Sequence, residues 1–123
     1  MTPADRWRLQ HMADAAELAA GFISGRAKAD LLADPMLRLA LTRAVEIVGE
    51  AAAQVSAEGR AAWPDVPWSQ IVGMRNRLVH AYFDVDTAIL WDTVELALPS
   101  LRQLPKPSLP MMILHAAPIL MAL

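Results

Sequence analysis

The chain has 123 residues, of which 55% are hydrophobic and 20% are charged, and its formal net charge at pH 7 is −2. This length predicts a single domain, and the absence of cysteine excludes disulfides, thiolate metal sites and cysteine nucleophiles. Because the net charge is slightly negative, the field of the whole molecule does not attract nucleic acid, and any anionic ligand has to be held by a local group of arginines.

The hydrophobic share is high for a monomer of this size, and an oligomer with a buried apolar face would account for the surplus. The first residues, MTPADRWRLQHMADAAE, carry charges throughout and lack the continuous apolar stretch of a secretory signal. We therefore expect a cytoplasmic protein.

The first predicted helix runs from Ala4 to about Ile23, and Gly25 closes it. Its apolar residues recur at three- and four-residue steps, namely Trp7, Met12, Ala15, Ala16, Ala19 and Phe22. A short connector helix is expected at Asp30 to Ala33. Asp34 and Pro35 then offer a cap and a first-turn proline for the next helix.

The longest predicted helix spans Pro35 to about Ser56. Its apolar seam suits antiparallel packing in a bundle and consists of Leu37, Leu41, Ala44, Val48, Ala51 and Val55. Gly59 and two prolines, Pro64 and Pro67, end this helical stretch because proline cannot continue a helix interior.

Two further helices are predicted, at Pro67 to about Tyr82 and at Thr87 to Leu104, separated by a break and cap at Asp84 to Asp86. The core side of the first is expected to hold Ile71, Met74, Leu78 and Tyr82. The inner face of the second is expected to hold Ile89, Leu90, Val94, Leu96 and Leu101, with Trp91 alongside.

No useful alternating strand pattern is present, so the predicted fold is all-α, an up-and-down four-helix bundle with a short connector helix. We expect a helical domain at residues 1–104 and an apolar C-terminal tail at residues 105–123. The tail, PKPSLPMMILHAAPILMAL, is too short and too interrupted by proline to span a membrane as a helix. We expect it to pack on the domain or on a dimer partner.

The stretch GMRNRLVHAYFDVD, residues 73–86, gathers polar side chains on one helix. At about 100° per residue, with Arg75 at zero, Asn76 lies at about 100°, His80 at about 140° and Gly73 at about 160°. Gly73 has no side chain, so a ligand can approach this side closely. Since Arg75 and His80 flank a ligand and do not meet on one ideal helix, two facing copies in a dimer would complete a shared cleft.

The residue types suit the cleavage of RNA without a metal or cofactor. An arginine clamps a phosphate, and a histidine moves a proton near neutral pH, so together they can activate a ribose 2′-hydroxyl and stabilise the charge that develops. Asn76 could donate to a phosphate oxygen or orient the imidazole. The alternative is a solvated helix face, with Arg77 a surface residue and Tyr82 an edge residue of the core.

The segment MRNRLVHAYFDVD resembles the R-x₄-H-x-Y motif of HepT-like proteins, the former DUF86 group within the HEPN superfamily of small helical toxins and nucleases. Three further segments are similar to family blocks in the same order: GRAKADLLAD, RAVEIVGEAA and VPWSQIVGMRN. The resemblance covers about residues 5–104. It does not extend to the apolar tail.

This resemblance implies a toxin–antitoxin function in which Arg75 and His80 are the ribonuclease residues and Asn76 belongs to the same site. It implies that Tyr82 accepts AMP from a minimal nucleotidyltransferase antitoxin, which inactivates the toxin. It also implies a homodimer with both motifs along a common groove. The alternative is a non-catalytic HEPN module that binds nucleotide or the nucleotidyltransferase.

Glu50 belongs to a block that recurs in the family, and we expect it to form a buried hydrogen bond or ion pair near the motif helix. Gly49 beside it would let two helices approach closely. Arg26 and Asp30 are expected to be structural, and His11 to be a packing residue of the first helix.

Overall fold

The computed structural model describes residues 2–80 and 86–104 of the chain, and the side chains of residues 78–80 lie outside this description. The described residues form helices and contain no strand, as the sequence predicts. The elements are α1 (Pro3–Ile23), α2 (Asp30–Ala33), α3 (Pro35–Ala53), α4 (Ala57–Ala61), α5 (Trp68–His80), α6 (Thr87–Asp92), the π-helical η1 (Thr93–Ala97) and the 3₁₀-helical η2 (Leu98–Gln103).

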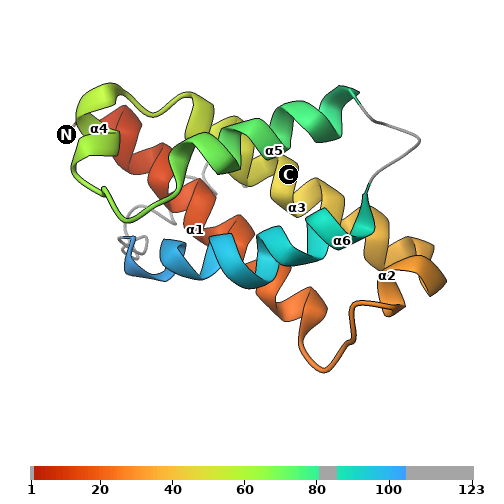
Figure 1. Ribbon diagram of the computed structural model, residues 1–123. Coiled ribbons are helices and arrows are strands. Elements are labelled where there is room, and N and C mark those ends of the chain that lie inside the picture. The colour runs from red at the N-terminus through yellow and green to blue at the C-terminus, as the bar shows by residue number, and fades with distance from the viewer. Residues whose placement is uncertain (1, 81–85, 105–123) are drawn as a thin grey trace, which may run out of the picture.

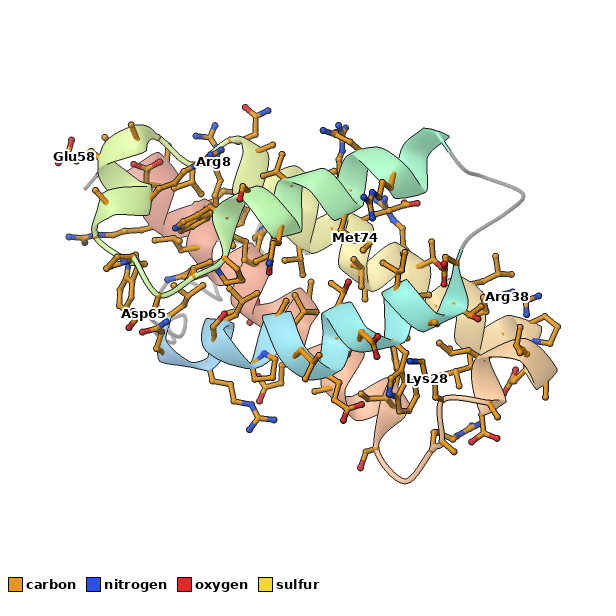
Figure 2. The ribbon with its side chains drawn as sticks, in the orientation of Figure 1. Arg8, Lys28, Arg38, Glu58, Asp65 and Met74 are labelled. Atoms are coloured by element: carbon orange, nitrogen blue, oxygen red, sulfur yellow. The ribbon has the colours of Figure 1, made fainter. Side chains whose placement is uncertain are left out.

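The long elements form an up-and-down bundle in which successive helices run in alternating directions (Figure 1). Helix α3 packs against α1 on one side and α5 on the other, and the continuous α6–η1–η2 segment packs against α5 and α1. The bundle is therefore closed around one core. Met74 of α5 points into the space between α5 and α6 (Figure 2).

Both ends of helix α1 are set by local features, a side-chain cap at the start and a glycine after the end. The side chain of Thr2 accepts a hydrogen bond from the backbone N–H of Asp5 at 3.1 Å, and Pro3 occupies the first turn, where a missing N–H costs nothing. At the other end, Gly25 adopts φ of +73°, a left-handed conformation that favours glycine. The predicted limits of this helix are confirmed.

The connector helix α2 and the start of α3 also follow the prediction. Asp34 caps α3 by accepting a hydrogen bond from the backbone N–H of Leu37 at 3.1 Å, and this bond holds the pKa of the Asp34 carboxyl below its ordinary value. Arg26 forms an ion pair with Asp34 at 3.2 Å, and the Asp30 carboxylate accepts the N–H of Ala27 at 2.8 Å. The structural roles expected for Arg26 and Asp30 are confirmed.

The core uses most of the predicted seam of α3. Five of its six members are buried, and Ala51 is partly buried against the core. The other helices contribute the remaining buried apolar side chains, which include Leu9, Met12, Leu31, Ile71, Leu90 and Leu101.

Helix α4 was not predicted, and α3 ends at Ala53 and not at Ser56. Ser56 caps α4 by accepting the N–H of Gly59 at 3.0 Å, and its own N–H donates to the buried carboxylate of Asp5 at 3.0 Å. A side chain at Gly59 would lie 2.9 Å from that carboxylate. This short helix therefore exists because residues 51 positions apart in the chain meet.

The last predicted helix, Thr87 to Leu104, is one continuous segment that changes from α-helix to π-helix and then to 3₁₀-helix. Asp86 caps it as expected, with hydrogen bonds from the N–H groups of Ala88 and Ile89. The regular α-helix ends at Asp92, and a π-helical turn and a 3₁₀ turn follow. Pro99, which has no N–H to donate, lies in the first turn of η2.

Two residues assigned to the inner face of this helix are exposed. Leu96 is 76% exposed and Ile89 is 36% exposed, whereas Leu98 is buried. The buried stripe instead steps by four, from Leu90 to Val94 to Leu98, which is ordinary spacing for one face of a helix. Ile89 precedes the π turn and lines an open groove between α5 and α6.

The described segments include no helix that is both long enough and apolar enough to cross a membrane. The last described residue, Leu104, is buried. The expected tail at residues 105–123 lies outside the described residues.

Candidate functional site

Helix α5 carries most of the predicted site residues, and its start is held by local contacts. The indole N–H of Trp68 donates to the carbonyl oxygen of Trp63 at 3.0 Å, and the guanidinium of Arg60 lies 5.7 Å from the centre of the Trp68 ring. The N–H of Ile71 donates to the carbonyl of Pro67. These contacts hold the first turn of α5 in place. They therefore set which residues of α5 face α3 and which face α6.

Arg75 lies where α5 approaches α3 most closely. A Cβ atom added at Gly49 of α3 would overlap the Cβ of Arg75, and it would lie 2.8 Å from the Arg75 Cγ and 3.2 Å from the carbonyl oxygen of Ile71. Only glycine fits at this crossing without a shift of α5. The side chain of Arg75 is consequently half-buried along the line between the two helices.

The guanidinium of Arg75 is not neutralised within the described residues. One terminal N–H donates to the side-chain oxygen of Asn76 at 3.1 Å, and no described carboxylate forms an ion pair with it. Its Nε is buried and has no hydrogen-bond partner among the described residues. A buried N–H without a partner costs free energy, whereas the exposed terminal N–H groups, which no described carboxylate holds, can donate to an incoming acceptor such as a phosphate.

Asn76 is exposed at the same place and serves as the acceptor for Arg75. The amide can thus orient the guanidinium while its own N–H groups face solvent. The structure brings these two predicted residues together.

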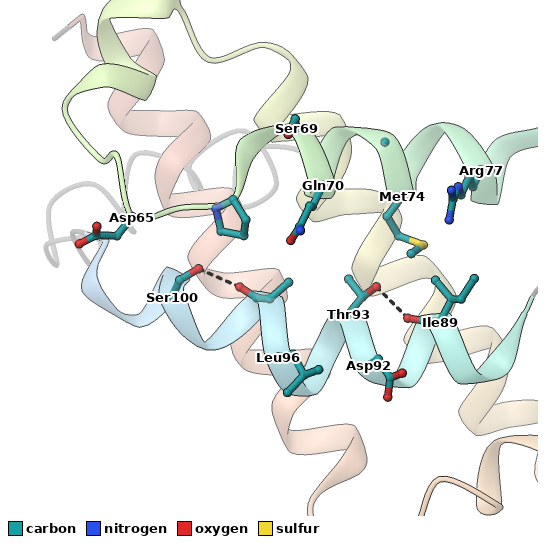
Figure 3. A pocket seen from close by; sticks show the side chains of 13 residues that line it. Asp65, Ser69, Gln70, Met74, Arg77, Ile89, Asp92, Thr93, Leu96 and Ser100 are labelled. Atoms are coloured by element: carbon teal, nitrogen blue, oxygen red, sulfur yellow. Dashed lines mark hydrogen bonds between the residues drawn. The ribbon is translucent and has the colours of Figure 1, made fainter.

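A groove of about 690 Å³ lies on another side of α5, between this helix and the α6–η1 segment (Figure 3). Gly73, Met74 and Arg77 line it from α5, and a Cβ added at Gly73 would meet no atom within 4 Å. Facing them are Ile89, Asp92, Thr93 and Leu96. Gly73 therefore borders open space, whereas Arg75 lies toward α3 and is not part of the groove lining.

His80 is the final residue of α5, and its side chain lies outside the described residues, as does all of Tyr82. The expected core positions of Leu78 and Tyr82 lie outside them too. Along an ideal helix, positions 73, 77 and 80 share one face because they are four and three residues apart. The groove thus leads along α5 toward position 80.

Glu50 differs from its expected role. Its carboxylate forms an ion pair at 3.3 Å with Arg43, which lies two turns earlier on the same face of α3, and its side chain is 43% exposed. Glu46 also pairs with Arg43, and these two carboxylates raise the pKa of the guanidinium, with Glu46 the larger influence. The ion pair exists, but it lies on the surface of α3 and is not buried against the motif helix.

His11 is exposed, and its ring lies 4.2 Å from the ring of Trp7 on the same helix. It packs on a tryptophan, although it does so at the surface and not in the core.

Arg77, which was predicted to be a surface residue, lines the groove, and so do Ser69 and Gln70, which were not predicted to belong to the site. The spacing of Ser69, Gly73 and Arg77, each four residues apart, could have revealed this stripe. Within the described segments, no group of three His, Cys, Asp or Glu side chains is arranged to hold a metal ion.

The fold defines an all-α protein of the HEPN-like helical class, and its helix α5 carries an arginine, Arg75, that has no carboxylate partner among the described residues. The profile of the family described as ribonuclease HepT-like matches residues 12–107, and the chain belongs to this family.

Curated relatives cover most of the chain. A protein of Thermococcus cleftensis named "Probable ribonuclease HepT" is 38% identical over 94 residues, which are 76% of this chain and 86% of the relative. A protein of Caldanaerobacter subterraneus subsp. tengcongensis, named as a candidate RNase, is 36% identical over 95 residues, or 77% of this chain and 85% of the relative. No solved structure matches the chain.

Proposed function

We propose that this protein is an endoribonuclease that cleaves RNA without a metal ion, with Arg75 and His80 as its catalytic residues. Membership of the ribonuclease HepT-like family and the names of its relatives support ribonuclease activity. The observation that carries the site assignment is the guanidinium of Arg75, which donates to Asn76 and has no carboxylate partner among the described residues. RNA phosphate is an acceptor of suitable charge and geometry for it.

In this mechanism His80 removes the proton from a ribose 2′-hydroxyl, and the 2′-oxygen forms a bond to the adjacent phosphorus. The bond from phosphorus to the 5′-oxygen breaks, and that oxygen takes a proton from a second acid or from water. The products are a 2′,3′-cyclic phosphate and a 5′-hydroxyl. Arg75 stabilises the charge on the phosphate oxygens, and Asn76 orients Arg75.

The active form is proposed to be a homodimer. Position 80 lies about 140° around α5 from Arg75, and Arg75 is directed toward α3 while the groove lies elsewhere. A twofold copy would bring the arginine of one motif and the histidine of the other to a common cleft. The exposed Leu96 and Ile89 on the groove rim supply an apolar contact for that copy.

We further propose that the protein is the toxin of a cytoplasmic toxin–antitoxin pair and that its partner is a minimal nucleotidyltransferase. Tyr82 is the proposed acceptor of AMP, two positions beyond His80. Each transferred AMP adds bulk and negative charge beside the site, which repels the RNA backbone and blocks its approach.

Incubation of unmodified protein with labelled RNA in EDTA tests the enzymatic proposal. We expect cleavage to fragments with cyclic-phosphate ends, and no cleavage of DNA with the same sequence because DNA lacks the 2′-hydroxyl. If the RNA is bound but stays intact, the alternative is favoured, namely a non-catalytic module that binds nucleotide or a nucleotidyltransferase.

A second assay tests the switch. With ATP and the nucleotidyltransferase of the proposed pair, the protein should gain the mass of AMP and lose ribonuclease activity. Tyr82→Phe protein should keep its mass and its activity, and modification of that variant would refute the assignment of Tyr82.

A further inference from the structure

Arg77 is an exposed cation at one end of the groove between α5 and α6, and no described carboxylate lies within ion-pair distance of it. Two carboxylates also line this groove. Asp92 is paired with Lys28 at 3.0 Å, and Asp65 lies at the end opposite Arg77 (Figure 3). The end of the groove near Arg77 is therefore locally positive, although the protein as a whole is slightly negative.

The groove also has the lining that a nucleotide requires. Met74 and Ala97 provide apolar surface for a base, and Ser69 and Gln70 provide polar groups on the α5 wall (Figure 3). The hydroxyl of Thr93 donates to the carbonyl of Ile89 at 2.8 Å, so its oxygen faces the groove as an acceptor. Single-stranded RNA is recognised in this way, by contact with base faces and hydrogen bonds to base edges.

The position of the groove connects it to the proposed chemistry. Gly73 and Arg77 are one turn apart, and position 80 follows on the same helical face at the end of α5. A phosphate held by Arg77 would lie about one helical turn, roughly 5 Å, from the level of position 80. Successive phosphates of an extended RNA strand can span that step.

We propose that this groove is an RNA subsite in which Arg77 binds a phosphate and Gly73 leaves room for the nucleotide next to the cleaved bond. The proposal rests on the ribonuclease function and adds a residue and a surface to it. Arg77 has a binding role here, whereas Arg75 has the catalytic one.

Binding measurements on the full-length His80→Ala protein test the subsite. This variant is expected not to cleave RNA, so the RNA stays intact during the measurement. We expect Arg77→Ala in this background to weaken the binding of a fluorescent single-stranded RNA about tenfold, or about 1.4 kcal/mol, because one phosphate contact is lost. The slope of log affinity against log salt should fall by about 0.7. The matched control is Arg102→Ala, an exposed arginine that lines a different groove, between α1 and η2.

A second pair of variants tests the space beside Gly73. Because a Cβ at this position meets no atom, both Gly73→Ala and Gly73→Gln should fold, with thermal stability equal to or above that of the wild type. Gly73→Gln fills the groove and should raise KM for RNA with little change in kcat. Gly73→Ala should have a much smaller effect on KM.

The outcomes separate this inference from the proposed function. If the wild type cleaves RNA, and Arg77→Ala and Gly73→Gln keep its affinity and KM, the subsite is wrong and the ribonuclease function stands. A fall in kcat alone would also overturn the subsite, because it would place Arg77 in the chemical step. If the wild type neither binds nor cleaves RNA, both proposals fail.

Discussion

The position of Arg75 depends on Gly49, a residue of α3 that has no side chain. Gly49 allows α3 and α5 to approach until the stem of Arg75 lies directly over the α3 backbone. The guanidinium is held at the edge of this crossing by Asn76, and its Nε is withdrawn from solvent. The pair of helices therefore orients the proposed catalytic cation before any substrate arrives.

Gly49→Ala should displace α5 and misplace Arg75. The added methyl group overlaps the Cβ of Arg75, which is too close to the backbone to move away alone. We expect unfolding in urea to show a loss of about 1–3 kcal/mol and RNA cleavage to fall by up to about 10²-fold. Gly21→Ala on α1, where a Cβ meets nothing, is the control and should gain up to about 1 kcal/mol. Equal stability for the two variants would contradict the tight crossing.

For individual residues, the sequence predicted candidate positions but not all of the side-chain partners that the structure contains. It identified Arg75, Asn76 and the open side at Gly73 as candidates, because helical geometry alone assigns them to faces. It expected a buried pair for Glu50, whereas Arg43 holds Glu50 at the surface. Such partners depend on which side chains from other helices come near, and a single sequence does not contain that information.

Among the helices, α1 and α4 are joined by the buried carboxylate of Asp5. The hydroxyl and the backbone N–H of Ser56 both donate to it, and these bonds hold the pKa of Asp5 below its ordinary value. A carboxyl whose pKa is lowered by folding stabilises the protein above its unfolded pKa. That stabilisation is lost as the pH falls through the lower pKa of the folded state.

Asp5→Asn should therefore destabilise the protein at neutral pH, and the difference from wild type should shrink as the pH falls below the ordinary aspartate pKa of about 3.9 and through the lower pKa of the folded state. Urea unfolding at several pH values measures both effects. Asp34, whose pKa is also lowered, is present in both proteins and cancels in the comparison. Asp14→Asn, an exposed change on α1, should leave stability unchanged. A difference that does not depend on pH would exclude the charged pairing with Ser56.

The ends of the helices were predictable because caps are local. Thr2, Asp34 and Asp86 each accept N–H groups two or three residues ahead of them, and Gly25 ends α1 through its own backbone. The short helix α4 was not predictable, because Ser56, which caps it, is held by Asp5, 51 positions away in the chain. The π turn of η1 was not predicted either.

For the whole molecule, the exposed Leu96 and Ile89 beside the groove mark the face at which the proposed second copy would bind. We expect Leu96→Glu to convert the proposed dimer into a monomer with unchanged helix content, because Leu96 is 76% exposed and contributes little to the core. RNA cleavage should be lost with the dimer. Leu39→Glu is the matched control, since Leu39 is 70% exposed on α3 and away from the groove lining.

Sedimentation and cleavage assays on the same samples check this prediction. If Leu96→Glu protein remains dimeric, the partner binds at another face. If it becomes monomeric and still cleaves RNA, one copy is sufficient for catalysis and the shared cleft is wrong.

Single-turnover kinetics measure whether His80 and Arg75 together cleave RNA. Cleavage of one labelled RNA in EDTA is measured for the wild type, His80→Ala, Arg75→Ala and the Arg102→Ala control, after circular dichroism has shown equal folding. We expect His80→Ala and Arg75→Ala to be slower by about 10²–10⁴-fold and the control to equal the wild type. Cleavage by His80→Ala at the wild-type rate would show that His80 is not catalytic.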